Sequence, residues 1–215
     1  MIYISKEKPP KSFVEYKQEA GARFDDMPTI VKTDLRQTLL AEQGYLCAYC
    51  MTRIADDGAH TKIEHLHSRN PQNELDYQNL LAVCHGGEGC PKKHQTCDSR
   101  KGHKELHVSP LDADDMDTIY YDYQGHILSK DESIKQELDQ ILNLNDEEGY
   151  LIHNRQRTLL SFQKQVRKKM GDKPLSSAQM EKLLRLYECG ENGKKRPYCG
   201  IVIWYLRKRL GLWKK

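Results

Sequence analysis

The sequence contains few aromatic residues and no long apolar run. Aromatic residues make up 8% of its 215 positions and hydrophobic residues 38%, whereas 30% are charged. The most apolar segment, residues 201–206, is far shorter than the ~18 residues that a membrane-spanning helix requires. We therefore expect no membrane span. The length allows one domain, or a small domain with an extension, whose modest core a bound metal would help to stabilise.

Signals for export and internal repeats are also absent. Residues 1–11 lack the apolar centre of a secretory signal, so a cytoplasmic location is expected. In that compartment disulfides are not expected, and clustered thiols indicate metal binding. The seven cysteines are Cys47, Cys50, Cys84, Cys90, Cys97, Cys189 and Cys199.

Charge is distributed unevenly along the chain. Residues 151–215 contain 17 Lys and Arg against 4 Asp and Glu, a formal charge of +13, whereas residues 1–150 carry −10. A basic segment of this kind is suited to contact nucleic-acid phosphates, but solvated helix faces or a surface that docks a partner protein would have the same composition. One predicted helix carries a cluster of these cations: Arg155, Arg157, Lys164, Arg167, Lys168 and Lys169.

Apolar spacing predicts a mixed α+β protein in four parts. Residues 1–33 are expected to form an N-terminal arm with at most one short helix, and residues 34–110 a compact core. In that core, Asp34 should cap a helix that ends near Gly44. The turn signal at Asp56-Asp57-Gly58 predicts a hairpin between residues 51–54 and 61–66.

The second half of the chain is predicted to be mainly helical. Residues 111–130 are expected to form an acidic linker and a hairpin that turns near Gly125. Residues 131–215 have the spacing of four helices, one of them capped by Ser176 with Gln179 and another by Asn145 with Glu148. This last part is the basic helical extension.

Cysteines suited to one tetrahedral Zn²⁺ lie in two groups along residues 47–102. Cys47 and Cys50 form the first pair, and Cys84 and Cys97 are the preferred second pair because they flank an irregular loop. Cys90 is a rival for either member of the second pair. His85 and His94 in the same loop are also possible ligands or substrate contacts.

Between and beside these thiols are the residue types that hydrolysis of a phosphodiester requires. His65 is suited to activate water, and the carboxylates of Glu64 and Asp98 suit a hard cation such as Mg²⁺. Successive residues of a strand point to opposite faces, so Glu64 and His65 can serve one site only near a strand end or bulge. Asn79 is expected either to bridge the backbone of the loop that holds His65 or to act as an ordinary turn or cap residue.

These residues, in this order, resemble the zinc-stapled HNH (ββα-metal) endonucleases. The segments 40–51, 63–65, 75–81 and 97–102 are similar in particular to the small HNH proteins of retron-linked and Septu-type anti-phage systems (PtuB-like). The likeness spans most of residues 1–160 and is much weaker from Leu175 onward. It implies an α+β fold in which a zinc-stapled ββα-metal core carries an N-terminal arm or helix and a mainly α-helical C-terminal extension.

The resemblance also implies a role for each matching residue. His65 matches the general base, Asn79 the asparagine that orients the catalytic loop, and Glu64 a ligand of the catalytic Mg²⁺ or Mn²⁺. Asp98 stands where many members have His or Asn, and an aspartate there favours a hard metal. Candidate substrate contacts are Lys101, Arg100 and His67, although Lys101 is equally consistent with a solvated helix face and His67 with a polar surface residue.

The function implied by the resemblance is a metal-dependent endonuclease of DNA or RNA, possibly tRNA, that acts as an effector of anti-phage defence. Its expected partners are an ABC/SMC-type ATPase (PtuA-like) and, in retron loci, the reverse transcriptase with its reverse-transcribed DNA. The alternative is a catalytically inactive, zinc-stapled subunit that binds nucleic acid or serves as an adaptor. Metal-dependent cleavage that is lost on substitution of Asp98 would distinguish the two.

Overall fold

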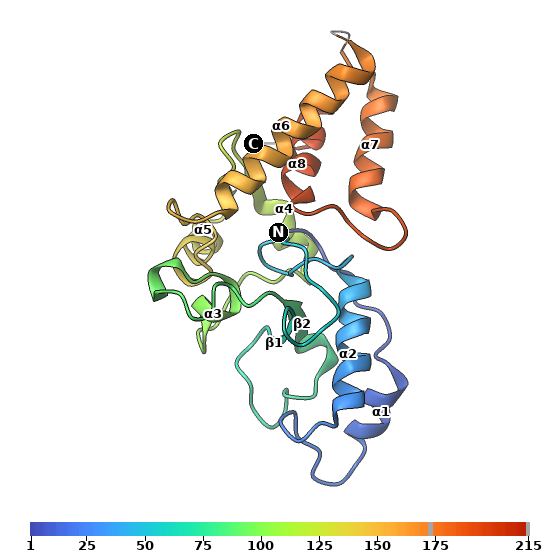
Figure 1. Cartoon of the computed structure of the whole chain (residues 1–215), viewed down its shortest axis with the longest axis vertical. Helices are drawn as coiled ribbons and strands as arrows, with labels where there is room; N and C mark the ends of the chain where they lie inside the picture. The colour runs from blue at the N-terminus through green and yellow to red at the C-terminus, as the bar shows by residue number, and fades with distance from the viewer. Residues whose placement is uncertain (172–173, 214–215) are drawn as a thin grey trace.

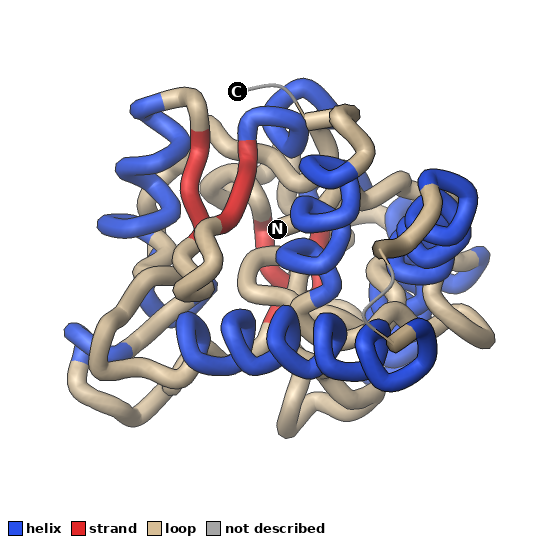
Figure 2. Tube along the Cα trace, turned by 90° about the horizontal axis from the view of Figure 1, so that it is seen from above, coloured by secondary structure: helices blue, strands red, loops and turns tan. Residues whose placement is uncertain are grey.

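The computed structural model describes residues 1–171 and 174–213, with the side chain of Met170 left out. It confirms a mixed α+β fold, in which helices surround two separate strand pairs (Figure 2). Helices α6, α7 and α8 gather at one end of the molecule, and α1 and α2 at the other (Figure 1). The elements are α1 (Lys11–Lys17), α2 (Thr29–Glu42), β1 (Lys62–His65), β2 (Leu80–Val83), α3 (Cys97–Lys101), α4 (Ala113–Thr118), β3 (Ile119–Tyr121), β4 (Ile127–Ser129), α5 (Glu132–Gln136), α6 (Leu151–Met170), α7 (Ser177–Cys189) and α8 (Cys199–Arg209). Short helical turns occupy Tyr77–Asn79, Lys92–His94 and Glu137–Ile141.

Helix α2 begins earlier than predicted. Its N-cap is Pro28, whose extended backbone directs the chain into the helix, and Val31 adds to the buried face formed by its three leucines. The prediction that Asp34 caps the helix was therefore wrong. Asp34 lies within α2, where its carboxylate accepts a 2.6 Å hydrogen bond from Ser12 Oγ of α1.

Strand β1 pairs with β2, not with residues 51–54, so the predicted hairpin was wrong. The antiparallel register sets Lys62 opposite Val83 and His65 opposite Leu80. All four residues of β2 are buried, and pairing satisfies their backbone groups in the interior. Residues 51–54 instead contribute a single bridge between Arg53 and Leu46, which closes the turn that contains Cys47 and Cys50.

Helix α2 positions the other edge of β2 through one side chain. The buried amide of Gln43, just after the helix, donates to Ala82 O at 2.7 Å and accepts from Ala82 N at 2.8 Å. An edge strand buried without such partners would leave costly unpaired backbone groups. The short sheet is thereby held against α2.

The predicted hairpin around Gly125 is confirmed as β3 and β4. The acidic stretch before it is not a plain linker, because residues 113–118 form helix α4. Asp112 caps this helix by accepting from the backbone N–H groups of Asp114 and Asp115, and Met116 anchors it in the core.

Helices α6 to α8 form the basic extension and enclose a core in which most of α8 is buried. The predicted Ser176–Gln179 cap of α7 is confirmed, whereas Asn145 caps no helix, and its side chain bonds instead to Ile127 of β4. Arg155 does not belong to the basic surface, because it is only 1% exposed. Its guanidinium donates to Gly125 O and Leu144 O, both at 2.6 Å, and so fastens the β3–β4 turn to α6.

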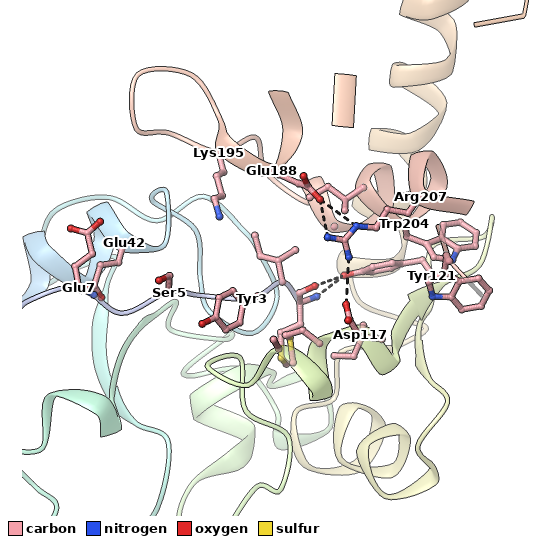
Figure 3. Close-up of a pocket in the computed structure, with 18 of the residues that line it drawn as sticks. Tyr3, Ser5, Glu7, Glu42, Asp117, Tyr121, Glu188, Lys195, Trp204 and Arg207 are labelled. Carbon is pink, nitrogen blue, oxygen red and sulfur yellow. Dashed lines mark hydrogen bonds and ion pairs between the residues drawn. The ribbon is translucent and has the colours of Figure 1, made fainter. Parts of the chain in front are cut away.

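A cavity of about 540 Å³ lies where the N-terminal segment meets α4, α7 and α8. Arg207 of α8 reaches between Glu188 of α7 and Asp117 at the end of α4, at 2.8 and 3.6 Å (Figure 3). Tyr3 and Tyr121 line the same cavity. None of the predicted catalytic or metal-binding residues borders it, so this cavity is separate from the site described below. No helix in the described parts of the chain has the length and hydropathy of a membrane span.

Candidate metal centre and catalytic site

Four cysteines converge on one point in the interior. The Sγ atoms of Cys47, Cys50, Cys84 and Cys97 all lie within 4.8 Å of one another. Two of these separations, Cys47–Cys97 and Cys50–Cys84, are 3.9 and 3.7 Å. Sulfurs placed ~2.3 Å from a tetrahedral Zn²⁺ lie about 3.8 Å apart, so donor type and spacing both suit this ion.

Each pair of cysteines comes from a different kind of local structure. Cys47 and Cys50 lie in a turn closed by a 3.0 Å bond from Met51 N to Cys47 O, and Met51 takes the positive φ that the turn requires. Cys84 directly follows β2 and Cys97 opens α3. The preferred set of four therefore comes together, whereas the rival Cys90 is exposed.

The two candidate histidines of the loop have other partners. His85 Nδ1 lies 2.9 Å from Glu88. His94 Nδ1 lies 3.1 Å from Asp146. Neither histidine belongs to a candidate metal cluster among the described residues.

Ionisation of the thiols depends on their mutual contacts. Hydrogen bonds from Cys47, Cys84 and Cys97 lower the pKa of Cys50 well below its ordinary value. Contacts with Cys47 and Cys50 raise the pKa of Cys84 and Cys97. The buried thiols thus oppose one another's ionisation, and a bound cation would stabilise several thiolates together.

Beside this cluster, two carboxylates meet between β1 and α3. Glu64 and Lys62 share the face of β1 that is turned toward α3, which carries Asp98 and Lys101. Lys101 Nζ lies 2.7 Å from Glu64 Oε1 and Lys62 Nζ 3.2 Å from Asp98 Oδ2. Burial, then a hydrogen bond with Asp98, raises the pKa of Glu64 to about 8. Two carboxylates this close are a suitable donor pair for a hard divalent cation that retains water ligands.

Lys101 lies inside the site. It is 3% exposed, and besides Glu64 it bonds to His65 O at 2.9 Å. The prediction of a solvated helix face was therefore wrong, and direct phosphate contact by Lys101 is not supported. Its ammonium group instead joins the end of β1 to α3.

Lys101→Met should destabilise the protein by about 3 kcal/mol, because a buried carboxylate then loses its partner. Because the pKa of Glu64 is raised to about 8, its carboxyl can take up a proton when Lys101 is absent. Protonation removes the unpaired buried charge and so limits the loss of stability to about this value. Chemical denaturation measures the change. Lys135→Met, which breaks the exposed Lys135–Glu132 pair, should change stability by less than about 0.5 kcal/mol. An equal effect of the two substitutions would contradict the structural role of Lys101.

His65 ends β1 and points away from the Glu64 carboxylate. Its Nε2 donates to Glu74 O at 3.0 Å, and the ring of Phe24 packs edge-on against the imidazole with centroids 4.5 Å apart. Because a carbonyl can only accept, this bond places the proton on Nε2 and leaves a lone pair on Nδ1. Burial is the main cause that lowers the pKa of His65, which favours the neutral base near pH 7.

Asn79 holds the loop that surrounds His65. Its Oδ1 accepts from His67 N at 2.8 Å, and its Nδ2 donates to His67 O at 3.2 Å and to Asn73 O at 3.4 Å. The side chain is buried beside the start of β2. This is the bridging geometry that the sequence suggested for Asn79.

Three residues near His65 carried no recognisable sequence signal. The Glu74 carboxylate accepts from Arg23 Nε at 2.6 Å and from Phe24 N at 3.2 Å, while its carbonyl accepts from His65. Glu74 thus couples the N-terminal segment to the imidazole. No motif marks these contacts, because they join residues about 50 positions apart in the sequence.

The other two candidate substrate contacts lie at the edge of the site. Arg100 Nη1 donates to Lys92 O at 2.8 Å and is partly buried. His67 is exposed in the loop after β1, where its Nδ1 lies 3.6 Å from Glu105. Of these two residues, His67 is the one more open to a ligand.

A cysteine cluster beside a Glu-His pair, a bridging asparagine and a second acid defines a candidate metal-dependent hydrolytic site. The chain is similar to a protein of Escherichia coli named "Retron Ec83 putative HNH endonuclease", at 35% identity over 83 residues. The match covers 33% of this chain and 32% of the relative. The chain therefore aligns with about a third of the curated relative's length, and no protein-family model matches it.

Proposed function

We propose that this protein is an HNH endonuclease that hydrolyses phosphodiester bonds with a zinc-stapled ββα-metal core. The observation that carries the proposal is the oriented base, a His65 imidazole held through Nε2 with its Nδ1 lone pair free to accept a proton. The order of β1, β2 and α3 and the similarity to a named HNH endonuclease support it. The four-cysteine cluster would hold the structural Zn²⁺.

The side chains have separate tasks in this reaction. His65 removes a proton from the attacking water, and Glu74 and Asn79 keep the imidazole and its loop in place. Glu64 and Asp98 would hold Mg²⁺ or Mn²⁺, which when bound stabilises the charge on the phosphate and the leaving oxygen. Lys101 holds Glu64 and the backbone of His65 in a fixed relation. His65 and Glu64 are successive residues at the end of β1, so the base and the cation ligands lie on opposite faces of the strand where it ends.

The biological role proposed is that of an effector in anti-phage defence in the cytoplasm. Its support is the retron in the name of the relative and the resemblance of residues 1–160 to retron-linked and Septu-type proteins. We propose an ABC/SMC-type ATPase as partner, together with a retron reverse transcriptase and its DNA. Helices α6 to α8, whose exposed cations include Lys168 and Lys169, are candidates for docking that partner or for contacting nucleic acid.

Purified protein should cleave DNA or RNA when Mg²⁺ or Mn²⁺ is supplied, and Asp98→Ala should lower the rate on the order of 100-fold because a cation ligand is lost. Gel assays on plasmid DNA and on tRNA measure both. The matched control is Asp56→Ala, because Asp56 pairs with Arg36 away from the site and its loss should leave the rate unchanged. Equal rates for Asp98→Ala and wild type would contradict the assigned cation site.

An inactive binding subunit is the second candidate function. One observation favours it: Lys62 and Lys101 already neutralise both carboxylates without a cation. Nucleic-acid binding without cleavage in any divalent metal, with and without the proposed ATPase, would support this candidate and contradict the nuclease.

A further inference from the structure

We propose that Arg69, Lys32 and Phe24 form a surface that receives the sugar-phosphate backbone of the substrate beside His65. The proposal deepens the proposed nuclease function and rests on it. None of these three residues belongs to the motifs that the sequence marks. They bring the N-terminal segment and the loop after β1 into the substrate site.

Two of these side chains, together with the His65 imidazole, lie around the Phe24 ring. Phe24 lies against the His65 imidazole at 4.5 Å, Arg69 Cζ lies 5.8 Å from the Phe24 ring centroid, and Lys32 Nζ lies 6.0 Å from it. After burial and its bond to Glu74, the charge of Arg69 is a further influence on the pKa of His65, which it lowers. Arg69 thus lies within electrostatic reach of His65, and Lys32 lies over the same Phe24 ring that packs on the imidazole.

The present partner of Arg69 resembles such a phosphate. Asp25 Oδ1 lies 2.6 Å from Arg69 Nη1, and the two side chains are 70% and 42% exposed. Guanidinium groups bind carboxylate and phosphate oxygens in the same way. Because an exposed ion pair contributes only about 0–1 kcal/mol, a phosphodiester can displace Asp25 at little cost.

Other cations near the site are committed to the protein itself. Arg23 pairs with Glu74, whose side chain is only 5% exposed, and Lys101 is buried against Glu64. Arg69 is exposed, and Lys32 is partly exposed with its Nζ bonded only to Asp25 O at the surface, at 3.1 Å, among the bonds described. Contacts of this kind recognise the phosphodiester backbone and carry no base sequence, so the surface predicts sequence-tolerant binding.

The test measures binding without cleavage, in a His65→Gln background that keeps an amide donor for Glu74 O. Fluorescence anisotropy compares labelled single-stranded DNA, duplex DNA and RNA of one sequence. Arg69→Ala and Lys32→Ala should each weaken binding on the order of 5-fold and reduce the salt dependence by about one phosphate contact. Asp25→Asn should tighten binding several-fold, because the nucleic acid no longer has to displace the exposed Asp25–Arg69 ion pair. Arg69→Lys should retain most of the affinity.

The matched control is Lys135→Ala, paired with Glu132→Gln. This Lys–Glu pair has side chains 41% and 68% exposed, similar to Arg69 and Asp25, and lies in α5, outside helices α6 to α8. It should leave binding unchanged. Unaltered binding by Arg69→Ala, or equal weakening by Lys135→Ala, would overturn the proposal. Binding that changes as expected, while the wild type fails to cleave, would count against the nuclease and leave this surface intact.

Discussion

His65→Ala is expected to lower the cleavage rate by about 10²- to 10⁴-fold, the usual contribution of a general base. The substitution removes the group whose Nδ1 accepts the proton of water. It leaves the four cysteines and both acids in place. Single-turnover cleavage with Mg²⁺ present measures the effect, and it should appear in the chemical step more than in substrate affinity.

Two matched variants make this result specific. His60→Ala removes an exposed imidazole before β1, where it pairs with Asp57, and should retain most of the rate. His65→Gln restores a donor for Glu74 O but no base, so it should stay as inactive as His65→Ala. If either variant of His65 cleaves at the wild-type rate while its metal content is normal, the catalytic assignment is wrong.

Cys84→Ser should have the largest effect on stability, through loss of the bound zinc. Structural zinc sites contribute about 10–16 kcal/mol of apparent binding free energy in small domains, a value comparable with the whole stability of a domain. Here the cluster joins the 47–50 turn, the end of β2 and the start of α3. Without it, α3 and the Asp98 that it carries lose their fixed position against β1.

Cys90→Ser is the matched control, because Cys90 lies six residues further along and is exposed. Metal analysis and thermal unfolding should show one zinc and an unchanged Tm for Cys90→Ser. They should show no bound zinc and a greatly lowered Tm for Cys84→Ser. Full zinc content in Cys84→Ser, or its loss in Cys90→Ser, would contradict the ligand set.

The two substitutions separate the metal centre from the reaction. His65→Ala should keep zinc and stability while losing cleavage, whereas Cys84→Ser should lose all three. If His65→Ala lost zinc together with cleavage, the metal centre and the catalytic residues would not be separable. The measurements therefore test the division between the cysteine cluster and the acids and base beside it.

The sequence by itself predicted the chemical parts of the site. Thiol ligands, an imidazole base and carboxylates for a hard cation are specific residue types, so their order and spacing can be recognised without coordinates. The preference for Cys84 over Cys90 also agrees with the cluster that forms. Local structure was equally readable where it depends on near neighbours, as in the Ser176–Gln179 cap and the turn at Gly125.

Tertiary structure alone decided which of these parts meet. The partner of β1 is β2, because burial of residues 80–83 outweighs the local turn signal at residues 56–58. Lys101 and Arg155 have charges typical of a surface, yet both are buried where carboxylate or carbonyl oxygens satisfy them. Phe24 reaches His65 through a contact that spans 41 positions. Long-range burial and hydrogen bonding set these contacts, and neither is encoded in residue spacing along the chain.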